Sequence, residues 1–386
     1  MQRINITPRL QWQQLVEKQG FRYHTLDDVP YWNESACYQF SEKEILMLEA
    51  TTQQLHTMCI EAAQYVVDND LFHLFGIPEA IVPLVRKAWD NSDSGYWSLY
   101  GRFDLAYDGV IPPKLLEFNA DTPTSLFEAG VVQWFWLQDY NPSADQFNSI
   151  DEKLRAAWEW IHEKYNSSVY HFACLKDAKG NIPQLQLRED ISNTAYVLDT
   201  ASSTKGLKYH FTDIGNVIWD GNRFADENGM TIETLFKLYP WEWMVHEIDT
   251  AAFKQSNVNW IEPIWKMLWS NKALLPVLWQ LYPDHPNLLA SYFEPRSSTY
   301  VKKPKLSREG ANIEVIKNGM VINSTGGDYG TEGFVYQDIA DIPNFDGNYP
   351  IIGSWVIGGE AAGMGIRESD SMITDNMSRF VPHYFV

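Results

Sequence analysis

The sequence predicts an α+β fold, with a mainly helical N-terminal region, strand-rich segments and a small α/β subdomain. Three observations support this prediction. Apolar residues recur with helical spacing early in the chain, a period of two begins near residue 96, and helix and strand patterns alternate over residues 151–220. At 386 residues, with 45% hydrophobic residues, the chain is long enough for more than one packed lobe.

The N-terminal region is expected to contain two helices. Residues 41–67 have the pattern of a long amphipathic helix. Ser41 is suited to be its N-cap, and Glu44, three residues later, completes a capping box. A second helix is expected over residues 78–89. Residues 1–95 are therefore predicted to form a mainly helical region.

Two strands joined by a turn are expected next. From residue 96 apolar and polar residues alternate, which is typical of a strand with one wet face. Asp108-Gly109 predicts a turn, and residues 114–119 predict the returning strand. The following helix is expected to begin at Ser125, where Glu128 would complete a second capping box.

The rest of the chain divides into an alternating part and a strand-rich part. Helices are expected over 152–164 and 193–203, and strands over 169–175 and 209–212, which predicts a small parallel sheet. Trp-rich helices are expected over 231–290, and strands with turns from residue 299 to the C-terminus. The predicted regions are 1–95, 96–145, 146–225 and 226–386, and together they are expected to form one catalytic unit.

Composition excludes some functions. A formal net charge of −20 argues against binding of nucleic acid through broad basic patches. The N-terminus has no apolar signal segment and the chain has no run of 18 apolar residues, so no membrane span is expected. Three widely spaced cysteines suggest a reducing compartment, and the cytoplasm is the expected location. The oligomeric state is left open.

The strand pair carries an unusual set of polar residues. If the chain reverses at Asp108-Gly109, Asp104 lies opposite Glu117, and Asn119 follows on the same face. Two carboxylates and an amide oxygen suit Mg²⁺, which takes a few protein oxygens and fills its other positions with phosphate and water. The alternative is that Arg102 neutralises these acids in an exposed ribbon.

Further groups of residues can bind anions. Thr122, Thr124 and Ser125 precede a helix, where hydroxyls and free N–H groups can hold a carboxylate or phosphate, or can simply cap the helix. Lys303 lies on a basic strand that can reach phosphates or can be a solvated surface. Arg367 lies on a later strand, where it can stabilise a phosphoryl group or can form a surface salt bridge.

Two glycine-containing segments lie near the basic strand. Arg308 stands in a loop that Gly310 ends. Residues 324–333 hold four glycines and can form a lid that supplies N–H donors to phosphates, although glycine-rich hairpin loops are also common. This segment matches neither the P-loop nor the dinucleotide-binding motif.

These stretches resemble the synthetase portion of the glutathionylspermidine synthase family, which belongs to the ATP-grasp ligases. Three strings carry the resemblance: Gly-Arg102-Phe-Asp104; Glu117-Phe-Asn119-Ala-Asp-Thr122-Pro-Thr124-Ser125-Leu-Phe-Glu128-Ala-Gly; and Val-Lys-Lys303-Pro with Arg308-Glu-Gly310-Ala-Asn312. The resemblance runs from about residue 10 to the C-terminus. It implies an ATP-grasp-like ligase fold with a small pre-ATP-grasp subdomain, and the amidase domain of bifunctional members is not expected.

The resemblance also implies cofactors and residue roles. ATP and Mg²⁺, as two ions, are the implied cofactors, and Ser125 stands where relatives that use glutathione have a cysteine. The implied roles are Mg²⁺ binding by Asp104, Glu117 and Asn119; contact with the transferred phosphoryl group by Arg102 and Arg367; nucleotide binding by Lys303, Arg308, Gly310, Tyr336 and Gln337; and binding of the acid substrate by Thr122, Thr124, Ser125 and Glu128.

The sequence therefore predicts an ATP- and Mg²⁺-dependent acid–amine ligase that forms an amide through an acyl phosphate. Its partners would be a small-molecule acid, for example a small peptide, and a polyamine-like amine. Two alternatives stay open: a nucleotide-binding protein without ligase turnover, and a kinase or ATPase that uses the same nucleotide site.

Overall fold

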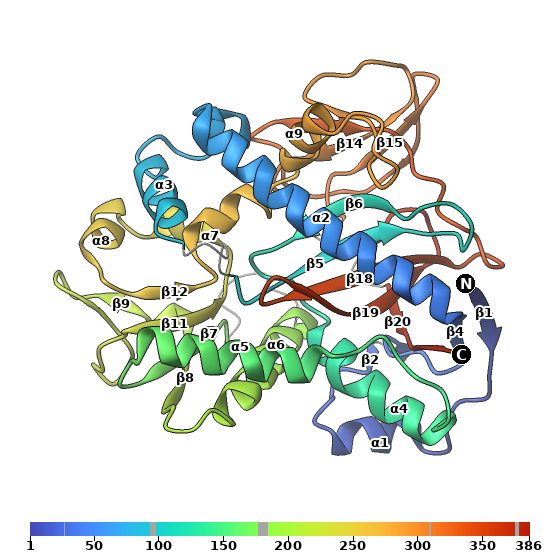
Figure 1. Ribbon diagram of the computed structural model, residues 1–386, viewed down its shortest axis with the longest axis horizontal. Coiled ribbons are helices and arrows are strands. Elements are labelled where there is room, and N and C mark those ends of the chain that lie inside the picture. Colours follow the sequence, from blue (N-terminus) through green and yellow to red (C-terminus); the bar gives the residue numbers. More distant parts are fainter. Residues whose placement is uncertain (27, 93–97, 177–183, 309, 375–377) are drawn as a thin grey trace.

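The computed structural model describes residues 1–26, 28–92, 98–176, 184–308, 310–374 and 378–386. Its centre is a five-stranded antiparallel sheet (Figure 1). The strand order is β20 (Arg379–Val381), β19 (Glu360–Ser369), β18 (Tyr349–Ile357), β5 (Tyr100–Ala106) and β6 (Lys114–Asn119). The predicted strand pair is therefore confirmed from residue 100 onward, and it joins strands from the other end of the chain. Residues 93–97, where the first strand was expected to begin, lie outside the described residues.

Helices cover the central sheet on both faces. Helix α2 (Glu42–Asp68) crosses β18 and β19 on one face, and α5 (Ile150–Tyr165) packs against the same strands (Figure 1). Phe103 and Leu105 belong to the apolar cluster around α2. Because side chains alternate along a strand, Arg102 and Asp104 point to the opposite face. This alternation positions the polar residues of β5 away from α2.

A second antiparallel sheet lies beside the central one. Its order is β13 (Ser291–Tyr292), β17 (Phe334–Gln337), β14 (Tyr300–Pro304), β15 (Glu314–Lys317) and β16 (Met320–Ser324). Asn318 and Gly319, both with positive φ, form the turn between β15 and β16. The strands and turns expected from residue 299 onward are thus confirmed.

The third sheet is small and parallel, as the sequence predicted. Its order is β12 (Asn259–Ile261), β11 (Thr234–Leu238), β7 (Tyr170–Cys174) and β8 (Tyr209–Asp213). Strands β11 and β12 lie beyond the expected range 146–225, and helices had been expected there. That expectation is wrong for β11, a buried strand of the sequence Thr-Leu-Phe-Lys-Leu. A run of only five residues does not distinguish a buried strand from a helix by its period. The division of the chain into four regions stays a prediction.

The N-terminal region is less helical than expected. The capping box of Ser41 and Glu44 at the start of α2 is confirmed. Strands β1 (Gln2–Asn5) and β4 (Ala36–Phe40), however, form a three-stranded sheet with β21 (His383–Phe385). These short strands pair across almost the whole length of the chain, and local periodicity does not reveal such pairing.

The other elements are short or peripheral. They are α1 (Trp12–Lys18), β2 (Thr25–Leu26), β3 (Val29–Pro30), η1 (Leu71–Phe75), α3 (Val82–Asp90), η2 (Glu128–Val132), α4 (Gln133–Tyr140), α6 (Gln184–Ser202), η3 (Ile214–Asn216), β9 (Ile218–Trp219), β10 (Phe224–Ala225), α7 (Trp241–Glu247), α8 (Thr250–Gln255), η4 (Ile264–Leu268) and α9 (Leu274–Leu281). Within the described residues no helix combines the length and the apolar character that a membrane crossing requires.

Candidate active site

The β5–β6 hairpin has the register that the sequence predicted. Asp104 lies opposite Glu117, and Arg102 lies opposite Asn119, with an irregularity directly after Asp104. Asp104 and Arg102 are buried, whereas Glu117 and Asn119 are half-buried. The two carboxylates and the amide therefore converge on one face of the hairpin.

Two arginines hold the Asp104 carboxylate. Arg102 donates to it through Nε at 2.7 Å and Nη2 at 3.2 Å, and Arg367 donates through Nη2 at 3.1 Å. The remaining Nη1 of Arg102 donates to the carbonyl oxygen of Thr124 at 2.6 Å. The two arginines predicted to contact the phosphoryl group, Arg102 on β5 and Arg367 on β19, thus bind the same carboxylate, that of Asp104.

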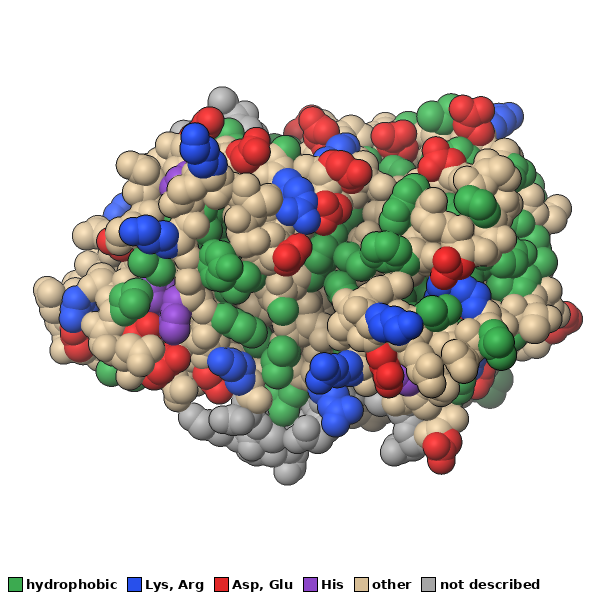
Figure 2. Space-filling view, turned by 90° about the horizontal axis from the view of Figure 1, so that it is seen from below, with side chains coloured by type: hydrophobic (Ala, Val, Ile, Leu, Met, Phe, Trp, Pro, Cys, Tyr) green, Lys and Arg blue, Asp and Glu red, His purple; other side chains and the backbone are tan. Residues whose placement is uncertain are grey.

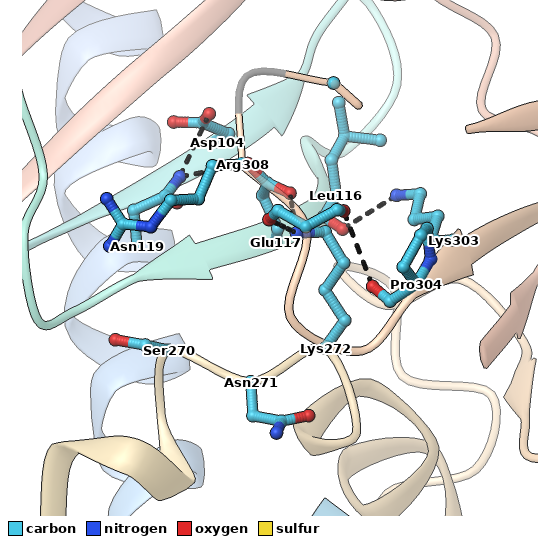
Figure 3. A network of polar contacts seen from close by, with 12 residues as sticks. Asp104, Leu116, Glu117, Asn119, Ser270, Asn271, Lys272, Lys303, Pro304 and Arg308 are labelled. Atoms are coloured by element: carbon cyan, nitrogen blue, oxygen red, sulfur yellow. Dashed lines mark hydrogen bonds and ion pairs between the residues drawn. The ribbon is translucent and has the colours of Figure 1, made fainter. Parts of the chain in front are cut away.

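Glu117 is held by a different cation. Lys272 forms an ion pair with its Oε2 at 3.0 Å (Figure 3). Burial alone would raise the pKa of Glu117, but the charges of Lys272 and Lys303 outweigh burial and lower the pKa to about 2. Glu117 is therefore an anion at neutral pH.

Asn119 connects the two carboxylates. Its Nδ2 lies 3.3 Å from Asp104 Oδ2 and 3.0 Å from Glu117 Oε1. A half-turn of the amide would present Oδ1 to the same space, so that three oxygen donors would face a cation. This donor set is of the hard, oxygen-only kind that Mg²⁺ prefers, and the residues fit the ion.

Lys303 lies on β14 next to the hairpin. Its Nζ donates to the carbonyl oxygen of Leu116 at 3.0 Å (Figure 3). The same Nζ donates to Gln337 Oε1 at 2.6 Å. Burial lowers the pKa of Lys303 to about 8, although Glu117 acts in the opposite direction. Lys303 and Gln337 border a mainly apolar cavity of about 80 Å³, whose apolar walls include Val301, Val315, Ile339 and Ile351.

A polar cavity of about 90 Å³ adjoins the apolar one, and Glu117, Gly310 and Thr374 line both. Gly310 has φ +69°, and an added Cβ would lie 2.1 Å from the carbonyl oxygen of Thr374, so only glycine fits there. The polar cavity is also lined by Arg102, Asn119, Thr122, Thr124, Glu189, Asp190, Glu242, Arg308 and Arg367. Cations and carboxylates thus share one cavity.

Thr122 and Arg308 meet across this cavity. Arg308 donates through Nη2 to Thr122 Oγ1, and its Nε lies 3.4 Å from Glu242 Oε1. The segment after β6 and the loop after β14 are therefore joined by polar contacts. Glu309, between Arg308 and Gly310, lies outside the described residues.

Ser125 and Glu128 do not line the polar cavity, and the capping box predicted for them is wrong. Ser125 is buried with φ +65°, and the amides of Leu126 and Phe127 bond Asn193 Oδ1 instead. The fully buried Glu128 carboxyl accepts hydrogen bonds from Tyr23 and Tyr31. Burial, together with the charge of Glu189, raises the pKa of Glu128 to about 8. Substrate contact by these two side chains would need a rearrangement.

Tyr336 also lies apart from the cavities. On β17, Gln337 points toward Lys303, and the neighbouring Tyr336 points to the other face, where its ring packs edge-on against Tyr300. Tyr336 is not among the residues that line the apolar cavity. Its predicted nucleotide contact would therefore involve the backbone.

Sequence reasoning missed several charged residues that support the hairpin. Lys266 donates to the carbonyl oxygens of Tyr100 and Ala120 at 3.0 and 2.8 Å and pairs with Glu262. Lys237 pairs with Asp121, directly after the predicted metal ligands, at 2.8 Å. These lysines are fully buried and lie in Trp-rich stretches. The only indication of these buried ion pairs in the sequence was the presence of lysines within apolar stretches.

A larger cavity of about 1080 Å³ lies elsewhere, among α4, α5, α6 and residues 19–23. Its lining includes Phe127, Trp134, Phe135 and Tyr196, together with Arg155 and Arg188. Figure 2 views the molecule from this side, where apolar side chains gather between acidic and basic ones. The lining of this larger cavity includes neither the predicted metal ligands nor the predicted nucleotide-binding residues, so the size of a cavity does not by itself identify the catalytic site.

The fold and the family comparison define a class of protein, the ATP-grasp-type ligases. A solved glutathione synthetase-like effector from Globodera pallida has a similar fold, with a TM-score of 0.54, 11% identity, and coverage of 97% of this chain and 98% of that chain. The model of the family described as glutathionylspermidine synthase preATP-grasp matches residues 3–386. The chain belongs to the glutathionylspermidine synthase family and is an ATP-dependent ligase that forms a C–N bond.

Named relatives agree with this assignment. A Haemophilus influenzae protein whose name provisionally assigns it as an acid–amine ligase is 40% identical, over 95% of both chains. Trypanothione synthetase of Crithidia fasciculata is 29% identical over 85% of this chain, which spans 53% of that enzyme. The bifunctional glutathionylspermidine synthetase/amidase of Escherichia coli is 25% identical over 96% of this chain, which spans 60% of that enzyme.

Proposed function

We propose that the protein uses MgATP to join the carboxylate of a small acid to an amine, at the cavity beside the β5–β6 hairpin. The observation that carries this proposal is the convergence of Asp104, Glu117 and Asn119 with Arg102 and Arg367. An oxygen donor set next to two arginines and a buried lysine matches what phosphoryl transfer requires.

The nucleotide would lie across the two adjoining cavities. The apolar cavity suits the adenine base, and Gln337 supplies polar groups at its wall. Lys303 stands between the apolar cavity and Glu117, where it can contact phosphates. Asp104, Glu117 and Asn119 would hold two Mg²⁺ ions, which supply charge neutralisation for the phosphates.

In the first step, an oxygen of the substrate carboxylate attacks the γ-phosphorus, and ADP leaves. Arg102 and Arg367 would stabilise the negative charge on the transferring group. Thr122, Thr124 and Arg308 line the same cavity and would hold the acid. The product of this step is an acyl phosphate.

In the second step, the amine nitrogen attacks the carbonyl carbon, and inorganic phosphate leaves as the amide forms. Glu189, Asp190 and Glu242 line the cavity and would attract a cationic amine. A carboxylate among these three would take the proton that the amine must lose. No covalent bond to the protein is needed.

Substrate entry requires the surrounding chain to move. Both cavities are smaller than the roughly 300–1,000 Å³ of sites that enclose small molecules. The glycine-rich segment 324–333 is the proposed lid. It reaches the Arg308 loop, where Asn312 bonds the carbonyl oxygen of Tyr329. Closure would exclude water, which otherwise hydrolyses an acyl phosphate.

The relatives suggest the class of substrate. The name glutathionylspermidine synthetase refers to a conjugate of glutathione, a small peptide, with the polyamine spermidine. We infer a small peptide carboxylate and a polyamine-like amine for this chain. Ser125 stands where relatives that use glutathione have a cysteine, so the proposal does not specify glutathione as the acid. A cytoplasmic location would give access to ATP and to both substrates.

A mass-spectrometric screen tests this proposal. Peptides and polyamines are incubated with MgATP, and a condensed product with loss of water is sought while ADP is measured. ADP release that requires both substrates supports the ligase. ADP release with the acid alone would indicate a kinase, and ADP release with neither substrate would indicate an ATPase. Binding of nucleotide without ADP release would indicate a protein that lacks turnover.

A further inference from the structure

Two histidines lie side by side in the small parallel sheet. Strands β7 and β8 both contain the string Tyr-His-Phe, and their register pairs His171 with His210. The two ring centroids are 5.7 Å apart. His171 is fully buried, and the His210 side chain is 31% exposed. The pairing thus places two imidazoles side by side, one on the internal strand β7 and one on the edge strand β8.

Two carboxylates face these histidines from the segment after β10. Asp226 Oδ2 lies 3.6 Å from His171 Nε2 and 3.4 Å from His210 Nε2. Glu227 Oε1 lies 3.6 Å from His210 Nε2. These distances exceed the usual range of 2.7–3.2 Å for an N–H···O hydrogen bond. Among the described residues, His171 Nε2, His210 Nε2 and Asp226 Oδ2 are buried and have no hydrogen-bond partner.

We propose that His171, His210, Asp226 and Glu227 form a binding site for a divalent transition-metal ion of the zinc class. Ligand atoms about 2.1 Å from a tetrahedral zinc ion lie roughly 3.4 Å from one another. The ligand atoms of His210, Asp226 and Glu227 all lie within 4.8 Å of one another, and His171 approaches this group through Asp226, at 3.6 Å. Imidazole and carboxylate ligands together favour zinc over magnesium. An ion would also satisfy the three polar atoms that lack partners.

The surroundings hold the carboxylates in a suitable orientation. Asp226 Oδ1 accepts the backbone N–H groups of Asn228 and Met230 at 2.9 and 2.8 Å, which leaves Oδ2 facing the histidines. Thr212 donates to Glu227 Oε2, which leaves Oε1 facing His210. Supporting hydrogen bonds of this kind are typical of metal ligands.

Charge gives a further argument. Among the described residues, neither Asp226 nor Glu227 forms an ion pair with a lysine or arginine. A divalent ion would balance these two carboxylates while both imidazoles remain neutral, the form that binds metals.

The site is separate from the proposed catalytic centre, because none of its four residues lines the polar or the apolar cavity. Asp226 directly follows the β9–β10 hairpin, and His210 lies on the edge strand β8. A bound ion would fasten this hairpin to the sheet. We therefore assign the ion a structural role.

Zinc titration of the full chain tests the proposal. The protein is treated with a chelator, dialysed and titrated with zinc chloride by calorimetry in excess magnesium chloride, which occupies the oxygen-only site. The expected result is one zinc ion per chain and a higher Tm with zinc. His171→Gln and His210→Gln should each weaken binding more than about tenfold. His73→Gln, an exposed histidine elsewhere, is the matched control and should bind as the natural chain does.

Cobalt provides a readout that reports the ligands. Co²⁺ at a tetrahedral site should give visible absorption bands in the natural chain and in His73→Gln, and the bands should vanish in His210→Gln. His210 is partly exposed, so this variant decides the question even if His171→Gln fails to fold. Absence of zinc binding in excess magnesium, or equal zinc binding by natural chain and His210→Gln, would overturn the proposal.

Discussion

Asp104 and Glu117 lie directly opposite each other on β5 and β6, yet different cations neutralise them. Arg102 and Arg367 pair with Asp104, whereas Lys272 pairs with Glu117. Two facing carboxylates would otherwise repel each other. The site therefore contains positive groups that can turn to phosphate oxygens when a magnesium ion takes over the carboxylates.

Removing either carboxylate should abolish turnover while the fold persists. Asp104→Asn or Glu117→Gln should lower Mg²⁺-dependent ADP release by more than about 100-fold, because each removes a charged ligand of the proposed ion. Circular dichroism and Tm report folding. Glu314→Gln, which removes the partner of Lys302 on β15, is the matched control and should keep its activity. Full activity of Asp104→Asn or Glu117→Gln would refute the proposed Mg²⁺ ligands.

Lys303 should take up a proton when ATP binds above about pH 8. Its pKa of about 8 means that the amine is largely neutral there in the free protein. Nearby phosphates favour the charged form and would raise this pKa, so binding takes up a proton and weakens as pH rises past this value. Calorimetry in two buffers of different ionisation enthalpy measures the uptake. Lys303→Met should eliminate it, and equal uptake by both proteins would exclude Lys303 as its source.

Glu128 should make stability depend on pH. Its pKa is about 8 in the folded protein and near 4.5 when unfolded, so the folded state holds the extra proton between these values. The contribution of this proton to the free energy of unfolding is fully present below about pH 4.5 and is lost as the pH rises toward 8. Relative to the natural chain, Glu128→Gln should therefore gain unfolding free energy, by up to a few kcal/mol, across this window.

Urea unfolding at several pH values measures that difference. Glu189→Gln offers a second check, because the charge of Glu189 contributes to the raised pKa of Glu128. In a Glu189→Gln background the pH dependence of the Glu128→Gln difference should be smaller. A difference that stays constant with pH would show that Glu128 is ionised in the folded protein at neutral pH.

Gly310→Ala should be more damaging than Gly319→Ala. Both glycines have positive φ, so alanine is strained at either position by about 1–3 kcal/mol. An added Cβ at Gly310 would also collide with the Thr374 carbonyl oxygen, whereas nothing lies within 4 Å at Gly319. We expect Gly310→Ala to lower Tm more than Gly319→Ala does. A raised KM for ATP is expected for Gly310→Ala and not for Gly319→Ala. Equal effects would show that the contact with Thr374 relaxes without cost.

The sequence predicted the hairpin because both signals are local. Alternation in β5 and β6 and a turn at Asp108-Gly109 are sufficient to place Asp104 opposite Glu117. The small parallel sheet was likewise predicted from alternating helices and strands, although β11 was mistaken for helix because its five residues are too few to show a diagnostic period.

The missing parts of the site depend on contacts between distant segments. Lys272 reaches Glu117 from a Trp-rich loop, and Glu189 and Asp190 reach the cavity from α6. No spacing in the sequence brings these residues to the hairpin. Glu128 shows the converse: its capping-box position was local and plausible, yet Tyr23 and Tyr31 from the N-terminal segment hold its carboxyl in the interior.

Oxygen-isotope transfer tests the central claim most directly. With an acid and amine pair found by the screen, the acid is labelled with ¹⁸O in its carboxylate, and the phosphate released in the reaction is examined by mass spectrometry. If the acid is activated as an acyl phosphate beside Arg102 and Arg367, the phosphate should carry one labelled oxygen for each amide formed. Amide formation with unlabelled phosphate would contradict the account.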